Sequence, residues 1–156
     1  MTLSLGALLA SLAACDRAAK LEEGVSTEVQ VRKEFGDPVT ITEQADGTRV
    51  FDYPRQPEGW ANWVIKIGAD GKVSSIRQLV TPDNFAKVTP GLTQIEVRKI
   101  LGRPARMQKF DLKKEEVWDW RFKQNGQDSK MFSVTLDAAG KVTATGVADD
   151  PREMKG

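Results

Sequence analysis

The feature that most constrains the fold of this chain is an internal repeat. Residues 27–38 align without gaps with residues 93–104, and Val-Arg-Lys, Gly and Pro recur at the same steps in both segments. Downstream, Phe-Asp-Tyr at 51–53 matches Trp-Asp-Trp at 118–120. A chain that repeats itself over most of its length is expected to build one small fold twice.

Each copy carries the signals that begin and end a short helix. A hydroxyl and a second polar side chain three residues later satisfy free backbone donors in a capping box. These pairs are Thr27 with Gln30 and Thr93 with Glu96. Gly36 and Gly102 are expected at the left-handed position that ends each helix, and a proline two residues later prevents its continuation. A shorter helix is expected before each, at residues 18–23 and 82–88.

After each helix pair the pattern changes to the alternation typical of strands. Strands are expected at residues 39–43, 48–53, 62–67 and 72–78, and again at 105–111, 116–123, 130–136 and 141–145. The predicted fold class is α+β: two tandem repeats, each a helix-helix pair packed on an antiparallel β-meander. Residues 15–80 and 81–148 are the expected repeats, and residues 149–156 are expected to form a C-terminal tail.

The same alternation divides the strand residues between two faces. The helix-covered face is expected to hold the large apolar side chains: Phe51, Tyr53, Trp63, Ile65, Ile67, Trp118, Trp120, Phe122, Phe132, Val134 and Leu136. The opposite face carries mixed side chains, including Asp52, Asp119 and Arg121, and is expected to be solvated.

The first 14 residues are uncharged and apolar, and they precede the only cysteine of the chain, Cys15. This run is too short for a membrane span, which needs about 20 residues, but it suits a secretory signal. Leu12-Ala13-Ala14-Cys15 resembles a bacterial lipobox, so we expect residues 1–14 to be removed and Cys15 to be acylated. The alternative is a first core helix with a buried cysteine. No Lys or Arg precedes the apolar run, so the true start codon remains open.

The composition argues against several classes of function. The net charge is +1, which provides no overall attraction to nucleic acid. The chain has no histidine, the commonest metal ligand and general base, so we expect no metal, no cofactor and no enzymatic activity. Asp52 and Asp119 occupy matching positions between aromatic residues and could act as an acid and base pair. Pairing with a neighbour such as Lys66 or Arg121 is the simpler interpretation.

The lipobox, the helix bearing Val-Arg-Lys, the Gly-x-Pro that follows it and the meander containing (Phe/Trp)-Asp-(Tyr/Trp) resemble the BamE-like lipoproteins, also called the SmpA/OmlA family. The resemblance implies a non-enzymatic protein-binding scaffold in the periplasm-facing cell envelope, with the β-barrel assembly machinery as partner. It also implies the outer membrane, whereas Asp16 after the cysteine favours the inner membrane, so both locations stay open. The tandem doubling resembles the β-lactamase inhibitory proteins. That likeness implies the alternative function, an inhibitor of an envelope enzyme.

The expected partner-binding residues are Trp60 and Arg55 in the loop at 54–60, together with Asp52 and Asp119 on the strands. The loop contains two prolines and no periodic pattern, so Trp60 has no evident place in the core. Tryptophan is enriched among residues that dominate interface energetics. The competing interpretation is that Trp60 folds back over the core as a lid. The basic pairs Arg32-Lys33 and Arg98-Lys99 are read either as a solvated helix face or as contacts for lipid head groups.

Overall fold

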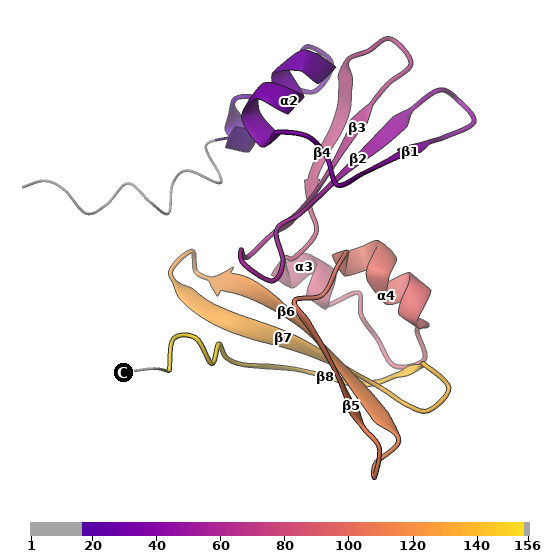
Figure 1. Ribbon diagram of the computed structural model, residues 1–156, viewed down its shortest axis with the longest axis vertical. Coiled ribbons are helices and arrows are strands. Elements are labelled where there is room, and N and C mark those ends of the chain that lie inside the picture. The colour runs from indigo at the N-terminus through magenta and orange to yellow at the C-terminus, as the bar shows by residue number, and fades with distance from the viewer. Residues whose placement is uncertain (1–16, 155–156) are drawn as a thin grey trace, which may run out of the picture. The chain divides into compact units, whose positions relative to one another are not determined.

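The computed structural model describes residues 17–154 (Figure 1). The expected signal segment, Cys15 and Asp16 therefore lie outside the described residues. The described residues divide into two compact units, one formed by residues 17–53 and 64–77, the other by residues 54–63 and 78–154. This division differs from the expected boundary after residue 80, because the loop before Trp63 makes its contacts with residues of the second unit.

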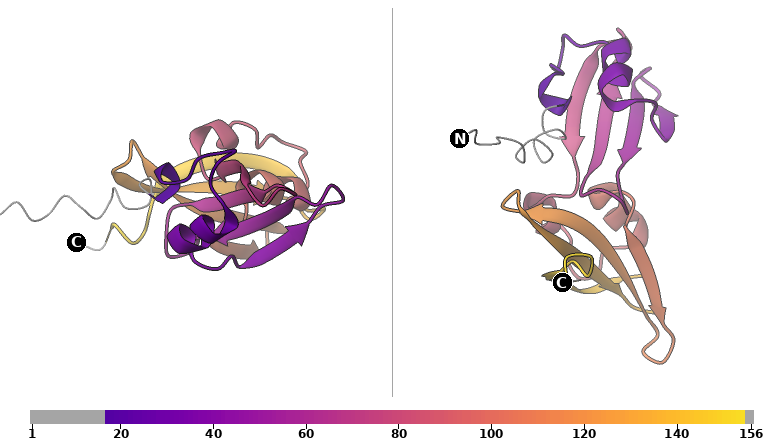
Figure 2. Two further views of the ribbon diagram at one scale, coloured as in Figure 1. Left: turned by 90° about the horizontal axis from the view of Figure 1, so that it is seen from above. Right: turned by 60° about the vertical axis from the view of Figure 1, so that its left-hand side comes forward.

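The first unit is built around a four-stranded sheet in the order β1-β2-β3-β4. Its strands are β1 (Thr40–Glu43), β2 (Arg49–Pro54), β3 (Asn62–Ile67) and β4 (Val73–Gln78). Helix α2 (Glu28–Phe35) lies on one face of this sheet, as the views in Figures 1 and 2 show. The Phe35 and Tyr53 rings lie 5.3 Å apart, and Tyr53 Oη donates to Gly36 O at 3.0 Å, which holds the helix end to the sheet.

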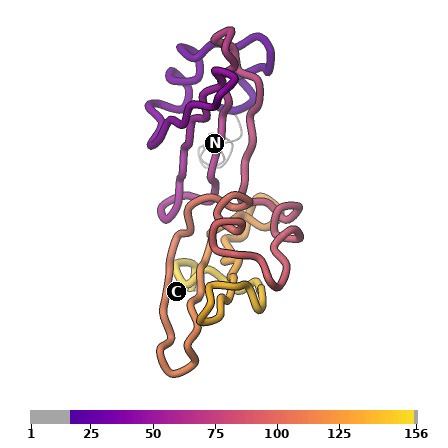
Figure 3. The backbone as a smooth tube through the Cα atoms, turned by 90° about the vertical axis from the view of Figure 1, so that its right-hand side faces the viewer, coloured from indigo at the N-terminus to yellow at the C-terminus, as the bar shows by residue number. Residues whose placement is uncertain are grey.

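The second unit has a sheet of the same sequential order, β5-β6-β7-β8. Its elements are α3 (Pro82–Phe85), α4 (Gln94–Leu101), β5 (Arg106–Phe110), β6 (Glu115–Gln124), β7 (Asp128–Leu136) and β8 (Val142–Asp149). Every neighbouring pair of strands is antiparallel, and the meander can be followed in the orange-to-yellow part of Figure 3. Trp120 Nε1 donates to Gly102 O at 3.2 Å, the counterpart of the Tyr53 contact.

Both long helices begin as the capping-box pattern predicts. The backbone N–H of Thr27 donates to Gln30 Oε1 at 2.8 Å, and that of Thr93 donates to Glu96 Oε2 at 2.8 Å. Both helices end at a glycine with positive φ, but the conformation is not the expected left-handed helical one. Gly36 has φ 80° and ψ −162°, and Gly102 has φ 73° and ψ −155°. This region is open essentially to glycine alone, because a Cβ would clash with the backbone.

Most strands match their predicted bounds to within one or two residues, and β3 matches at both ends. The last strand was predicted too short: β8 runs to Asp149 instead of ending at residue 145. Its residues after Val142 are exposed, so β8 lacks the apolar alternation that marks a half-buried strand. The expected C-terminal tail is also structured at its start, where Asp150 is fully buried.

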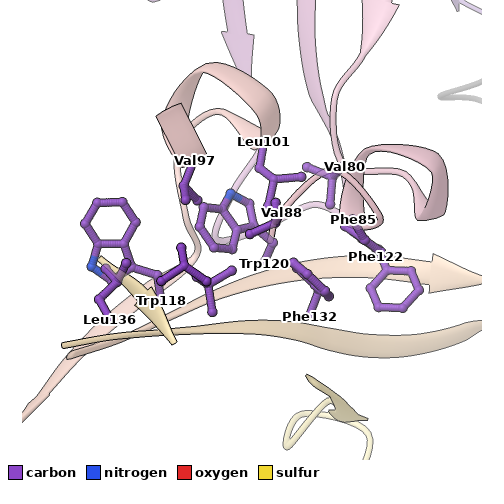
Figure 4. Close-up of a cluster of buried hydrophobic side chains, with 12 residues drawn as sticks. Val80, Phe85, Val88, Val97, Leu101, Trp118, Trp120, Phe122, Phe132 and Leu136 are labelled. Atoms are coloured by element: carbon purple, nitrogen blue, oxygen red, sulfur yellow. The ribbon is translucent and has the colours of Figure 1, made fainter. Parts of the chain in front are cut away.

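The core of the second unit lies between its helices and one face of the sheet. Figure 4 shows Leu101, Val88 and Phe85 directed toward the aromatic side chains of β6 and β7. Phe85 stacks on Phe132 with ring centroids 4.1 Å apart. All the predicted core aromatics of this unit are buried. In strand β3, Ile65 and Ile67 are fully buried, and Trp63, two residues before Ile65, is half-buried.

The opposite face of the second sheet is not simply solvated as expected. Asp119 is 1% exposed, Met131 is 3% exposed, and Ser129 is also buried. Asp119 is held by Arg106, whose Nε lies 2.8 Å from Asp119 Oδ2, and by the Ser133 hydroxyl. Its partner is therefore a residue of the neighbouring strand β5 and not Arg121.

Candidate functional site

In the loop at residues 54–60, the side chain of Gln56 bonds to the backbone of Arg121 at the edge of strand β6. Gln56 Nε2 donates to Arg121 O at 2.8 Å, and the Arg121 N–H donates to Gln56 Oε1 at 3.1 Å. Strand β5 starts opposite Asp119, so its register leaves Arg121 without a strand partner on that edge. The buried amide of Gln56 supplies both missing hydrogen bonds. An unpaired backbone group there would cost about 1–3 kcal/mol.

Trp60 lies farther along this loop and is 37% exposed. Its Nε1 donates to Ser129 Oγ at 2.7 Å. Two cations also lie near the ring, with Lys123 Nζ 4.3 Å and Arg152 Cζ 5.4 Å from the ring centroid. In strand β7, the side chain of Ser129 lies on the face opposite that of the core residue Phe132. Trp60 bonds to Ser129, so it lies against the sheet face opposite the helix-covered core. It is neither a lid over that core nor a freely projecting side chain.

A buried carboxylate lies beside Trp60. Asp150 Oδ2 accepts from Ser129 Oγ at 2.7 Å, Arg121 Nε at 3.0 Å and Arg152 Nη2 at 3.1 Å. Arg121 and Arg152 also donate to the carbonyl oxygens of Pro57 and Glu58, which ties the loop to this cluster. We call Gln56, Trp60, Arg121, Ser129, Asp150 and Arg152 the loop cluster.

Burial and hydrogen bonding have opposite effects on the pKa of Asp150. Burial raises the pKa of this carboxyl. Hydrogen bonds from the Arg152 backbone, the Ser129 hydroxyl and the Arg152 guanidinium, with the charge of Arg121, outweigh it and lower the pKa to about 2. Asp150 is therefore a charged anchor at neutral pH. Sequence reasoning missed it because it follows the last periodic residue, and only its position beside Pro151 hinted at a turn.

The four predicted binding residues do not form one cluster. Trp60 and Arg55 share the loop, where the Arg55 N–H donates to Asn62 Oδ1 at 3.3 Å. Asp52 belongs to the first unit, and its Oδ2 accepts from Thr40 Oγ1 at 2.8 Å and not from Lys66. Asp119 is buried on β6. Their roles in binding stay predictions, and Trp60 is the most exposed of the four residues.

Three further features of the described residues bear on function: the grouping of metal-ligating side chains, the pairing of buried polar atoms and the apolar length of the helices. Within residues 17–154, no group of three or more His, Cys, Asp or Glu side chains is placed to hold a metal ion. Buried side-chain nitrogen and oxygen atoms in this range all have hydrogen-bond partners. No helix in the same range is long and apolar enough to cross a membrane.

The family comparison matches the second half of the chain. Residues 78–146 match the family model described as "Outer membrane protein assembly factor BamE domain". Through this segment the chain belongs to the BamE-like family. The matched residues contain both helices and nearly all of the sheet of the second unit. No curated protein matches the chain.

Three solved structures are similar to this BamE-like chain. One, described as the osmotically inducible lipoprotein OsmE, is 31% identical, with 46% of this chain and 75% of that chain covered at a TM-score of 0.37. A DUF4309-family protein from Bacillus subtilis is 17% identical over 86% and 85% of the chains, with a TM-score of 0.34. A protein from Streptococcus mutans described as a β-lactamase inhibitor is 13% identical over 88% and 96%, with a TM-score of 0.36. At these TM-scores the overlays carry no argument about function.

Proposed function

We propose that this BamE-like chain is a lipid-anchored, periplasm-facing envelope protein that binds protein partners and has no catalytic activity. The observation that carries the proposal is the match of residues 78–146 to a domain described as an outer-membrane protein assembly factor. The lipobox ending at Cys15 supports the anchor. Two acyl chains bury enough methylene groups for stable attachment, at about 0.8 kcal/mol each.

We further infer that the two units descend from one duplicated module. Their sheets have the same strand order, and Thr27 pairs with Lys72 as Thr93 pairs with Lys141. The proposed role of the second unit is the assembly-related one, because the family match falls on it. The loop cluster adds to this unit a partly exposed tryptophan that is held in place before any partner arrives. Such preorganisation reduces the entropy lost on binding.

Lipidation and location are tested together by membrane fractionation and mass spectrometry of the amino-terminal peptide. We expect a lipid-modified peptide beginning at Cys15, recovered with outer-membrane markers. The matched variant Cys15→Ser should lose both the modification and the membrane association. Recovery of a soluble wild-type chain that retains residues 1–14 would contradict the anchor. Recovery with inner-membrane markers would confirm the anchor and assign the other membrane.

Partner binding is tested by isolating the tagged, lipidated chain from detergent-solubilised membranes. We expect subunits of the β-barrel assembly machinery to accompany it, and Trp60→Ala to lower their recovery. Lys66→Ala, a strand residue of the first unit, is the control and should leave recovery unchanged. Isolation of a stoichiometric envelope enzyme, with inhibition of its activity, would instead favour the inhibitor function. If no protein accompanies the tagged chain, whether it is isolated from inner or from outer membranes, the scaffold role is refuted.

A further inference from the structure

Two arginines occupy equivalent positions in the two units. Arg32 and Arg98 are each the middle residue of a Val-Arg-Lys segment, near the end of helices α2 and α4. The Cζ atom of Arg32 lies 5.2 Å from the centroid of Phe51, and that of Arg98 lies 5.2 Å from the centroid of Trp118. Phe51 and Trp118 are themselves equivalent in the repeat. Both units therefore place an arginine guanidinium over an aromatic ring at equivalent positions of the repeat.

In the first unit this guanidinium is occupied by two carboxylates of the chain itself. Arg32 Nε lies 3.0 Å from Glu28 Oε1, and Arg32 Nη1 lies 2.5 Å from Asp37 Oδ1. The hydrogen bond to Glu28, and then the one to Asp37, raise the pKa of Arg32 above its ordinary value. The first unit thus shows that carboxylates fit this position and bind the arginine from two sides of its fork.

In the second unit both carboxylates are absent from the sequence. Gln94 stands at the position of Glu28, and Arg103 stands at the position of Asp37. Within residues 17–154, the only hydrogen-bond partner of the Arg98 guanidinium is Met107 Sδ at 3.7 Å, and the Arg103 side chain has no ion-pair partner. At the position of Thr40, which bonds Asp52, the second unit carries Arg106, which bonds Asp119.

These replacements surround a shallow pocket with positive charge. The pocket has a volume of about 140 Å³ and is lined by Arg98, Arg103, Pro104, Ala105, Arg106 and Met107. Three arginines line this pocket, and of these only Arg106 pairs with a carboxylate in the described part of the chain, that of Asp119. Guanidinium donors in a planar fork match the two oxygens of a carboxylate. We call this the arginine pocket.

We propose that the arginine pocket binds a glutamate or aspartate side chain from an acidic segment of a protein partner. The incoming carboxylate takes the place that Glu28 and Asp37 occupy in the first unit, and Arg98 and Arg103 donate to it. A carboxylate is favoured over a lipid phosphate because carboxylates are the groups that occupy the equivalent arginine within this same chain. The inference names a contact outside the loop cluster, so it can fail while the scaffold role stands.

The test uses the detergent-solubilised full chain and a fluorescent hexaglutamate peptide with blocked ends. We expect saturable binding that weakens as salt is added, and no binding of the matched hexaglutamine peptide. The double variant Gln94→Glu/Arg103→Asp introduces into the second unit the two carboxylates that Glu28 and Asp37 supply in the first. It should fold normally and lose about tenfold or more in hexaglutamate affinity, as expected when charged hydrogen bonds are removed.

Two further variants separate the pocket from general electrostatics. Lys99→Glu/Lys87→Gln changes the net charge of the chain by the same amount at two exposed positions, one in α4 and one in the turn after α3. Hexaglutamate affinity should stay within about twofold of the wild type. Glu28→Gln/Asp37→Arg opens the position in the first unit and should add a second binding site. An equal loss in the lysine variant would overturn the proposal. So would binding of phosphatidylglycerol-containing vesicles, but not hexaglutamate, through Arg98 and Arg103.

Discussion

The indole N–H of Trp60 donates to the hydroxyl of Ser129 at 2.7 Å, although the two residues are 69 positions apart in the chain. The same hydroxyl donates to Asp150 at 2.7 Å, so one serine joins the loop at 54–60 to the C-terminal segment. The exposed tryptophan is therefore part of a connected polar network. A substitution of Trp60 should therefore alter the surroundings of Asp150, and a substitution of Asp150 those of Trp60.

Trp60→Ala should lower the free energy of unfolding of the second unit by about 1–2 kcal/mol, through the lost hydrogen bond and the lost ring contacts. Trp60→Phe keeps a ring near Lys123 and Arg152 and should cost only about 1 kcal/mol. Urea denaturation followed by circular dichroism measures both. Equal stability of wild type and Trp60→Ala would mean that the ring contributes nothing to the folded state.

Asp150 should make stability depend on pH in the acid range. Its pKa is about 2 in the folded protein, below the ordinary value of 3.8, so the charged form stabilises the fold. This contribution is fully present above about pH 4 and is lost as the pH falls through about 2, with a size on the order of 2 kcal/mol. Asp150→Asn should lower stability at neutral pH and flatten the curve between these values.

The control for this prediction is Asp149→Asn, because Asp149 is exposed and pairs with Lys130 at the surface. It should change stability by less than about 1 kcal/mol at any pH. Denaturation midpoints measured across the acid range decide the matter. An unchanged acid dependence in Asp150→Asn would assign the transition to other carboxylates.

Asn62 closes the end of helix α4 in the second unit. Its Nδ2 donates to Leu101 O and to Arg103 O, both at 2.8 Å, and the side chain is buried. Asn62→Ala should destabilise the protein by about 2–3 kcal/mol, since two carbonyl oxygens lose their donor. Asn84→Ala removes one such bond, to Leu79 O, from a partly exposed site and should cost about half as much. Thermal unfolding of the two variants side by side tests the ratio.

The two helix-ending glycines should respond differently to the same substitution. Gly36→Ala should cost about 1 kcal/mol or more from its positive φ alone, because nothing lies within 4 Å of the added Cβ. Gly102→Ala should cost more, because its Cβ would come within 3.0 Å of Asn62 Nδ2 and 3.2 Å of Asn62 Cβ. Equal destabilisation in chemical denaturation would show that Asn62 moves aside freely.

The sequence by itself determined the features that depend on residues a few positions apart. The capping boxes at Thr27 and Thr93, the glycines that end the helices, and strand Asn62–Ile67 all follow from local hydrogen bonding or from alternation along the strand. The resemblance to the BamE-like proteins also rests on such short motifs, and the family match agrees with it.

Only the tertiary structure decided where the loop at 54–60 packs, why Asp150 is buried, and that Asp119 pairs with Arg106 and not with Arg121. These contacts join residues that are far apart in the chain and show no period. Their stability comes from satisfying buried donors and charges after the strands have been brought together. The arginine pocket also depends on the tertiary structure: Arg32 pairs with Glu28 and Asp37, whereas the guanidinium of Arg98 stacks over Trp118 without a carboxylate partner among the described residues, and the folding of the chain brings Arg98, Arg103 and Arg106 together.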